Sequence, residues 1–85
     1  MLYKIEYLDG VYDQLAIIPK NTRQSIIKAI NERLTVTPYR FKPLVCNSDW
    51  HFRMRFGDYR VIYRVEDKKV TVVIVRVAAR GNVYE

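Results

Sequence analysis

The chain has 85 residues, a formal net charge of +6 and a single cysteine. This length excludes a second core, so we expect residues 1–85 to form one domain. One cysteine excludes an intrachain disulfide, and Cys46 with the lone His51 cannot form a zinc site unaided. We interpret Cys46 as a buried free thiol in a reducing compartment.

Other site classes also lack their residues. Glycines are too few and too scattered for a phosphate-binding loop, and the carboxylates are too dispersed for a two-metal nuclease. No apolar run is long enough to span a membrane, and the alternating N-terminus lacks the apolar core of a signal peptide. We therefore expect a cytoplasmic protein with no cofactor, no metal and no membrane partner.

The first half of the chain predicts a strand followed by two helices. Residues 2–8 alternate between polar and apolar, as a short strand does. Asp9 predicts the cap of a helix that runs to about Ile18, where Pro19 breaks it. Asn21 predicts the cap of a second helix, and so short a link should make the two an antiparallel hairpin.

Apolar residues recur at helical spacing in both predicted helices, which indicates one core-facing side on each. In the first these are Val11, Leu15 and Ile18, and in the second Ile26, Ile27, Ile30 and Leu34.

The second half predicts an antiparallel meander of three strands. Residues 36–49 form a long connection in which Pro38 and Pro43 should prevent regular structure. Three runs of strand-forming residues then follow, separated by links short enough for hairpins. They cover residues 50–56, 59–66 and 69–77. The third run is apolar on both faces, so we expect it to be central in the sheet.

These elements define an α+β fold with the order β-α-α-β-β-β. A helical hairpin should cover one face of a mostly antiparallel four-stranded sheet and leave the other face open.

Strand alternation sorts the meander residues onto the two faces. The apolar set must face the helices and consists of Phe52, Met54, Phe56, Tyr59, Val61, Tyr63 and Val65. The opposite set is strongly basic and consists of His51, Arg53, Arg55, Arg60, Ile62 and Arg64. Arg76 and Arg80 follow near the end of the third strand, and Tyr84 can return over the open face.

Arginine dominates this face, and no acid is interleaved among Arg53, Arg55, Arg60 and Arg64. A planar guanidinium donates two parallel hydrogen bonds to a phosphate. Packed arginines repel one another, so a polyanion is the natural compensation. Solvation is the competing interpretation, because an open sheet face is normally polar. Solvation is the better explanation for any single arginine, but it explains the cluster less well.

Such a surface has some of the chemistry that RNA cleavage needs. Guanidinium groups can stabilise the charge that develops when a ribose 2′-oxygen attacks the adjacent phosphorus. Arginine cannot act as a base, because its pKa exceeds about 12. Tyr84 and His51 are the candidates for proton transfer. A strand-start position beside Trp50 explains His51 at least as well.

Two segments resemble the RelE/ParE toxin superfamily. Residues 51–65, which contain Gly57-Asp58-Tyr59-Arg60, resemble its central signature. Residues 79–84 resemble its closing arginine and tyrosine element. The N-terminal strand and helical hairpin also fit, so the resemblance extends over essentially the whole chain.

The resemblance implies a toxin of a type II toxin–antitoxin module, with a cognate antitoxin, messenger RNA and the ribosome as partners. RelE-like members are metal-independent endoribonucleases that cut messenger RNA in the ribosomal A site. The family's catalytic positions fall on Arg53, Arg55, Arg60, Arg80 and Tyr84. Charge stabilisation is implied for Arg60, leaving-group contact for Arg80 and 2′-hydroxyl activation for Tyr84. His51, Arg64 and Arg76 are predicted to bind RNA.

The chain departs from the family pattern in two places. Arg53 and Arg55 replace lysines of RelE and cannot donate a proton through a lowered pKa. Ala79 stands where many relatives have a histidine. Two alternatives stay open, a ParE-like toxin that inhibits DNA gyrase by binding it, and a nucleic-acid-binding module without activity.

Overall fold

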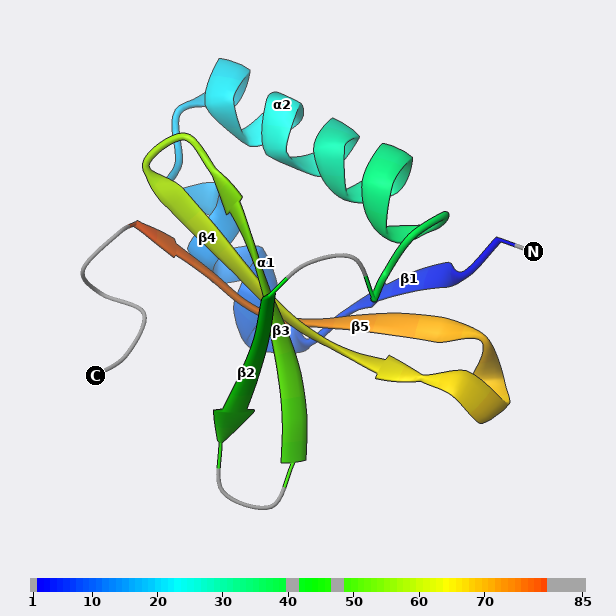
Figure 1. Cartoon of the computed structure of the whole chain (residues 1–85). Helices are drawn as coiled ribbons and strands as arrows, with labels where there is room; N and C mark the ends of the chain where they lie inside the picture. Colours follow the sequence, from blue (N-terminus) through cyan, green and yellow to red (C-terminus); the bar gives the residue numbers. More distant parts are fainter. Residues whose placement is uncertain (1, 40–41, 47–48, 80–85) are drawn as a thin grey trace.

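The computed structural model describes residues 2–39, 42–46 and 49–79, with side chains described for residues 2–39 and 51–79. A strand and two helices come first, then four strands, as Figure 1 shows. The elements are β1 (Lys4–Tyr7), α1 (Asp9–Ala16), α2 (Lys20–Ala29) with a π-helical turn (Ile30–Leu34), β2 (Lys42–Cys46), β3 (Asp49–Phe56), β4 (Tyr59–Glu66), a 3-10 turn (Asp67–Lys69) and β5 (Thr71–Ala79).

The strands form one mixed sheet in the order β1-β5-β4-β3-β2. β1 runs parallel to β5, and every other neighbouring pair is antiparallel. In Figure 1, α1 lies behind the crossing strands and α2 lies above them. The predicted α+β fold class is confirmed, and so is the central position of the last strand, because β5 pairs on both sides.

The sheet has one strand more than predicted, because β2 lies in the connection that was expected to lack regular structure. Its register places Pro43 opposite Phe52. β2 is the last strand in the sheet order, and an edge strand tolerates proline because one side of its backbone needs no partner.

The core lies between the helices and the predicted inward face of the sheet. Val11 and Leu15 from α1 and Ile18 from the link after it pack with Ile26, Ile30 and Leu34 from the second helical segment. Met54, Val61 and Tyr63 meet them from the sheet, and all three are fully buried. Strand alternation therefore assigned the inward side chains of β3 and β4 correctly.

The predicted helix caps are wrong. α1 begins at Asp9 itself after Leu8, and α2 begins at Lys20 after Pro19, with no side-chain capping bond at either start. The extended backbone of Pro19 (φ −51°, ψ 142°) sets the start of α2 two residues earlier than expected. Asn21 therefore lies inside the first turn, where it cannot act as the cap.

A bulge interrupts the pairing of β4 with β5. Ile62 lies opposite Arg76, whereas the next residue, Tyr63, lies opposite Ile74. Val75 is therefore an extra residue in β5. A bulge of this kind re-aims the residues that follow it, which matters for the position of Arg76.

Candidate nucleic-acid interface

The open face of the sheet carries arginines in cross-strand register. Arg55 of β3 lies directly opposite Arg60 of β4. Arg53 lies opposite Ile62, and Ile62 lies opposite Arg76 of β5. Directly opposed side chains are about 4.5–5.5 Å apart at Cβ, so like charges here repel unless an anion lies between them. We call Arg53, Arg55, Arg60 and Arg76 the arginine cluster.

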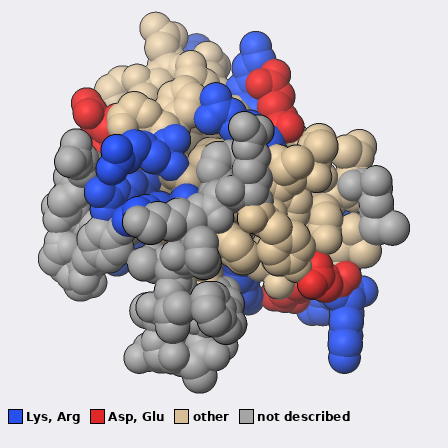
Figure 2. Space-filling model, viewed as in Figure 1, with Lys and Arg blue, Asp and Glu red and all other residues tan. Residues whose placement is uncertain are grey.

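The cluster is partly accessible to a ligand. Arg55 is exposed, and Arg53, Arg60 and Arg76 are half-buried. In the view of Figure 2, one group of blue side chains lies left of centre, and other blue side chains lie beside red ones at the top and at the lower right. The sequence-based prediction that Arg53, Arg55 and Arg60 share one face is therefore confirmed by the register, and Arg76 joins them.

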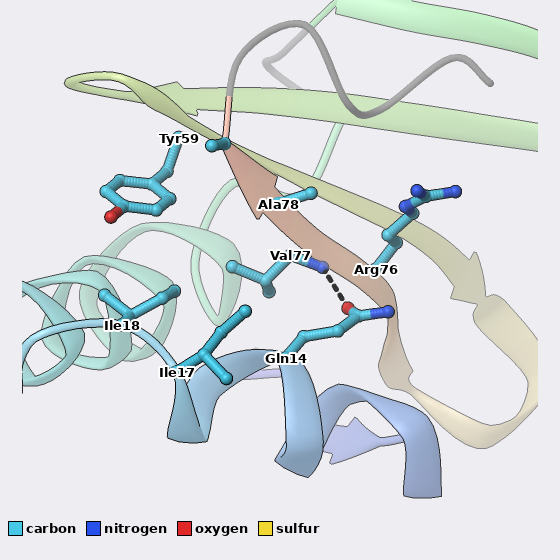
Figure 3. Close-up of a pocket in the computed structure, with 8 residues that line it drawn as sticks. Gln14, Ile17, Ile18, Tyr59, Arg76, Val77 and Ala78 are labelled. Atoms are coloured by element: carbon cyan, nitrogen blue, oxygen red, sulfur yellow. Dashed lines mark hydrogen bonds between the residues drawn. The ribbon is translucent and has the colours of Figure 1, made fainter.

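Arg76 reaches the open face because of the bulge at Val75. Val72 and Ile74 belong to the helix-side core, and simple alternation would have placed Arg76 on the same side. The extra residue shifts the pattern, so Val77 faces the helices and Arg76 does not. Figure 3 shows Arg76 and Val77 on opposite sides of the strand.

α1 covers the edge of β5 beyond the end of β1. The side-chain carbonyl of Gln14 accepts the Val77 N–H at 2.7 Å, as Figure 3 shows. A hollow of about 220 Å³ remains beside this contact, bordered by Ile17, Ile18 and Tyr59 among others. The bond satisfies a backbone donor that no strand reaches, which fixes the end of β5 next to the cluster.

Two apolar residues form the floor of the open face. Ile62 is 6% exposed and Val73 is 1% exposed, although neither belongs to the helix-side core. Long arginine stems at neighbouring positions can cover such a floor while their charged ends stay in water. The face therefore combines an apolar base with cationic ends.

Arg64 is directed to an acid rather than to the cluster. Its Nε donates to Glu66 Oε2 at 3.1 Å, and Lys69 lies 3.5 Å from Glu66 Oε1. The hydrogen bond from Arg64 is the main reason that the pKa of Glu66 lies below its usual value. The expectation that Arg64 is free of acid partners is corrected, because Glu66 lies two residues further along the same strand face.

The remaining site predictions have different outcomes. His51 is half-buried and lies opposite Leu44, and no described residue hydrogen-bonds its buried Nδ1. Arg80 and Tyr84 lie outside the described residues. Lys42 was not predicted as a site residue, yet its register position is opposite Arg53. Lys42 was missed because the connection that contains it was expected to have no strand that could align it.

An aromatic stack supports the cluster from the helix side. The rings of Phe52 and Tyr63 stack at 5.5 Å with an interplanar angle of 16°, and Tyr39 meets Phe52 edge-on at 5.5 Å. The buried Tyr63 hydroxyl donates to the Pro38 carbonyl at 2.6 Å, and burial raises the pKa of this hydroxyl. Phe52 and Tyr63 are chain neighbours of Arg53 and Ile62, so the stack limits the movement of the open face.

Among residues 2–39 and 51–79, no cluster of histidine, cysteine and acidic side chains could hold a metal ion. No helix in the described part of the chain is long and apolar enough to cross a membrane.

The chain is similar to known toxins over nearly its whole length. Residues 5–84 match the family model described as ParE toxin of type II toxin-antitoxin system, parDE. Toxin RelG of Mycobacterium tuberculosis is 31% identical over 99% of this chain and 98% of that protein.

Solved structures show the same fold. The toxin–antitoxin complex RelBE2 from Mycobacterium tuberculosis matches with a TM-score of 0.86 and 29% identity, over 96% of this chain and 95% of that one. The archaeal RelE–RelB complex from Pyrococcus horikoshii matches with a TM-score of 0.78 and 28% identity, over 96% of this chain and 99% of that one. The isolated RelE toxin of Escherichia coli matches with a TM-score of 0.78 and 19% identity, over 96% of this chain and 88% of that one. At this identity the match shows a shared fold alone. The chain therefore belongs to the ParE toxin family within the RelE/ParE superfamily and is a RelE-like toxin of a type II toxin–antitoxin system.

Proposed function

We propose that this toxin is a metal-independent endoribonuclease that cleaves messenger RNA, with the ribosomal A site as the place of cleavage. The observation that carries the proposal is the direct opposition of Arg55 and Arg60 beside Arg53 and Arg76. Such an arrangement destabilises a free sheet face but suits an RNA phosphate that develops extra negative charge.

The reaction needs charge stabilisation and two proton transfers. The ribose 2′-oxygen attacks the adjacent phosphorus, the bond to the 5′-oxygen breaks, and a 2′,3′-cyclic phosphate and a 5′-hydroxyl result. Arg60 stabilises the phosphoryl oxygens, and Arg53 and Arg55 bind the phosphate. Arg80 contacts the leaving 5′-oxygen, which takes its proton from solvent water, and Tyr84 takes the 2′-hydroxyl proton. His51, Arg64 and Arg76 bind the flanking RNA, Arg64 through the part of its guanidinium that Glu66 leaves accessible.

In this proposal the arginine cluster makes Tyr84 a better base, because positive charge lowers the pKa of a phenol. The reaction takes place in the cytoplasm, where the ribosome presents the messenger. A cognate antitoxin neutralises the toxin. The complexes of RelE-like proteins with RelB antitoxins from Mycobacterium tuberculosis and Pyrococcus horikoshii support this partner.

The test is to express Arg60→Ala, Arg80→Ala and Tyr84→Phe and to map messenger cleavage on ribosomes by primer extension. Loss of the charge-stabilising Arg60 should reduce the cleavage rate by about 10²–10³-fold. Lys68→Ala, in the exposed turn after β4, is the matched control and should cleave normally. Cleavage should persist in EDTA at concentrations that spare ribosomes. Full cleavage by all three site variants would disprove the proposal.

The description of the matching family model favours one second candidate, a toxin that inhibits DNA gyrase by binding it. A supercoiling assay with purified gyrase separates the two functions. Inhibited supercoiling with intact messenger RNA would replace the nuclease proposal with the ParE-like one.

A further inference from the structure

Gln14 is a polar residue on the apolar side of the first helical segment. Val11, Leu15 and Ile18 surround it at helical spacing, and all three are buried, whereas Gln14 is half-buried. A polar side chain at such a position needs a partner inside the fold. The carbonyl oxygen of Gln14 has one, because it accepts the Val77 N–H at 2.7 Å (Figure 3).

This contact lies where β5 has no outer strand beside it. β1 pairs with β5 as far as Ile74, whose carbonyl accepts the Leu8 N–H at 3.1 Å. The bulge at Val75 follows at once and disturbs the pairing with β4 on the other side. The end of β5 is therefore held less regularly than its start, and the Gln14 side chain takes the place of a neighbouring strand at Val77.

Packing beside the contact is open to solvent. The hollow of about 220 Å³ next to it is bordered by Ile17, which is 86% exposed. Water in such a hollow can accept a hydrogen bond from a backbone N–H, so the Val77 donor does not need a glutamine to be satisfied. A side chain that is anchored in α1 supplies something that water does not, a fixed direction for that N–H.

The restraint passes directly to Arg76. A peptide unit is planar, so the Cα of Arg76 lies in one plane with the Val77 N–H. A bond that fixes the direction of this N–H also fixes the plane from which the Arg76 side chain starts. Arg76 extends away from Val77 (Figure 3) and lies opposite Ile62 in the arginine cluster. Because an arginine side chain is long, a small tilt of this plane moves the guanidinium by a much larger amount.

We propose that Gln14 is a positioning residue for RNA binding, because its bond to the Val77 N–H directs Arg76 towards RNA on the open face. The inference rests on the proposed function, in which Arg76 binds RNA that flanks the cleaved phosphate. A guanidinium binds phosphate best through two parallel hydrogen bonds, which demand a defined orientation. Gln14 therefore contributes to RNA affinity without touching RNA, and it contributes little to the rate of the chemical step.

Amide exchange in the free toxin, followed residue by residue by NMR, tests the restraint itself. Gln14→Met keeps the side-chain length and removes the acceptor, whereas Gln14→Glu keeps an acceptor. The Val77 amide should exchange at least about tenfold faster in the first variant and stay protected in the second. The Leu8 amide, bonded to Ile74 O, is the internal control and should not change. Equal protection of Val77 in wild type and Gln14→Met overturns the proposal.

Cleavage kinetics on ribosomes programmed with messenger RNA test the consequence. In Gln14→Met, the toxin concentration that gives half the maximal rate should rise about tenfold, the effect of weakening a hydrogen bond to a charged group. The maximal rate should change by less than about threefold. Ile26→Val, a core change in α2 that leaves the Gln14 bond in place, is the control for lowered stability and should keep the wild-type half-saturating concentration. Equal rises in the two variants overturn the proposal.

A double-mutant cycle tests whether Gln14 acts through Arg76. Arg76→Ala should raise the half-saturating concentration at least as much as Gln14→Met does. Adding Gln14→Met to Arg76→Ala should then raise it by less than about twofold more, because the side chain to be positioned is already absent. Fully additive effects would show another route to RNA binding and would overturn the proposal.

These outcomes separate the role of Gln14 from the nuclease proposal. A wild-type toxin that leaves messenger RNA intact overturns both. Wild-type cleavage with an unchanged half-saturating concentration in Gln14→Met overturns the positioning role alone, and the nuclease proposal stands.

Discussion

The two faces of β4 are made by alternate residues of the same eight-residue strand, yet they differ in almost every property. On the helix side, Val61 and Tyr63 are fully buried and belong to the core. On the open side, Arg60 and Arg64 are half-buried, and Arg60 lies opposite another arginine. Burial of apolar groups on the helix side stabilises the fold, whereas the directly opposed charges of Arg55 and Arg60 on the open side repel each other.

Burial alone does not separate the two faces. Ile62 on the open side is almost as buried as Ile30, which belongs to the helical turn after α2, at 6% and 0% exposure. The difference lies in what surrounds each side chain. Ile30 packs among apolar side chains of the core, whereas the neighbours of Ile62 in the register are Arg53 and Arg76. The two faces therefore differ in the rigidity and the charge of the side chains that surround the buried isoleucine.

The largest expected difference comes from truncating these two isoleucines. Ile30→Ala should reduce the free energy of unfolding by about 2–5 kcal/mol, because a packed core cannot close around the cavity. Ile62→Ala should cost about 2 kcal/mol or less, because flexible arginine stems can collapse onto the gap. Urea unfolding measures both. An equal or larger loss for Ile62→Ala would show that the open face is packed as tightly as the core.

A smaller effect is expected where a polar group crosses the helix-side core. Tyr63→Phe removes the hydroxyl that donates to the buried Pro38 carbonyl, which should cost about 1–3 kcal/mol. Tyr12→Phe, at an exposed tyrosine, is the matched control and should change stability by less than about 0.5 kcal/mol. Thermal melting of the two variants compares them directly, and equal melting temperatures would assign no stabilising role to the bond.

The smallest effect has the opposite sign and belongs to the open face. Arg55→Gln keeps most of the side-chain length and removes one charge of the Arg55–Arg60 pair, so it should stabilise the free toxin by roughly 0.2–1 kcal/mol. The gain should shrink at high salt, because screening already weakens the repulsion. Lys28→Gln on the exposed side of α2 should give no such gain. Destabilisation by Arg55→Gln at low salt would show that the arginines are not mutually repulsive.

Sequence periodicity predicted the faces of β3 and β4 because every second residue of each strand is apolar and the residues between them are polar, except for Ile62. It failed at β2, where Lys42 and Pro43 start a strand without an alternating pattern and proline argues against pairing. Only the sheet order shows that this strand lies at an edge, where proline is tolerated. The helix hairpin was predicted, but its start residues were not, since Pro19 determined the start of α2 in place of Asn21.

The sequence predicted which arginines belong to the candidate site better than it predicted how they are arranged. Strand alternation places Glu66 on the same face as Arg64, but only the structure shows that the two side chains pair. Nor does the sequence show that Arg76 belongs to the cluster. Its place depends on an irregularity in pairing between two strands, a property of the sheet and not of β5 alone.

The bulge at Val75 also has a consequence for comparing this toxin with its relatives. Removing Val75 would join Ile74 directly to Arg76, and strict alternation would then leave Arg76 outward and Val77 inward, as they are now. Loss of Val75 therefore leaves every other side chain of β5 on its present side of the sheet. A deletion between Thr71 and Ile74 would instead move the bulge or transfer side chains of β5 to the opposite side. In an alignment of relatives, a one-residue gap in this strand belongs at Val75, and the arginine after it should be aligned as the equivalent position.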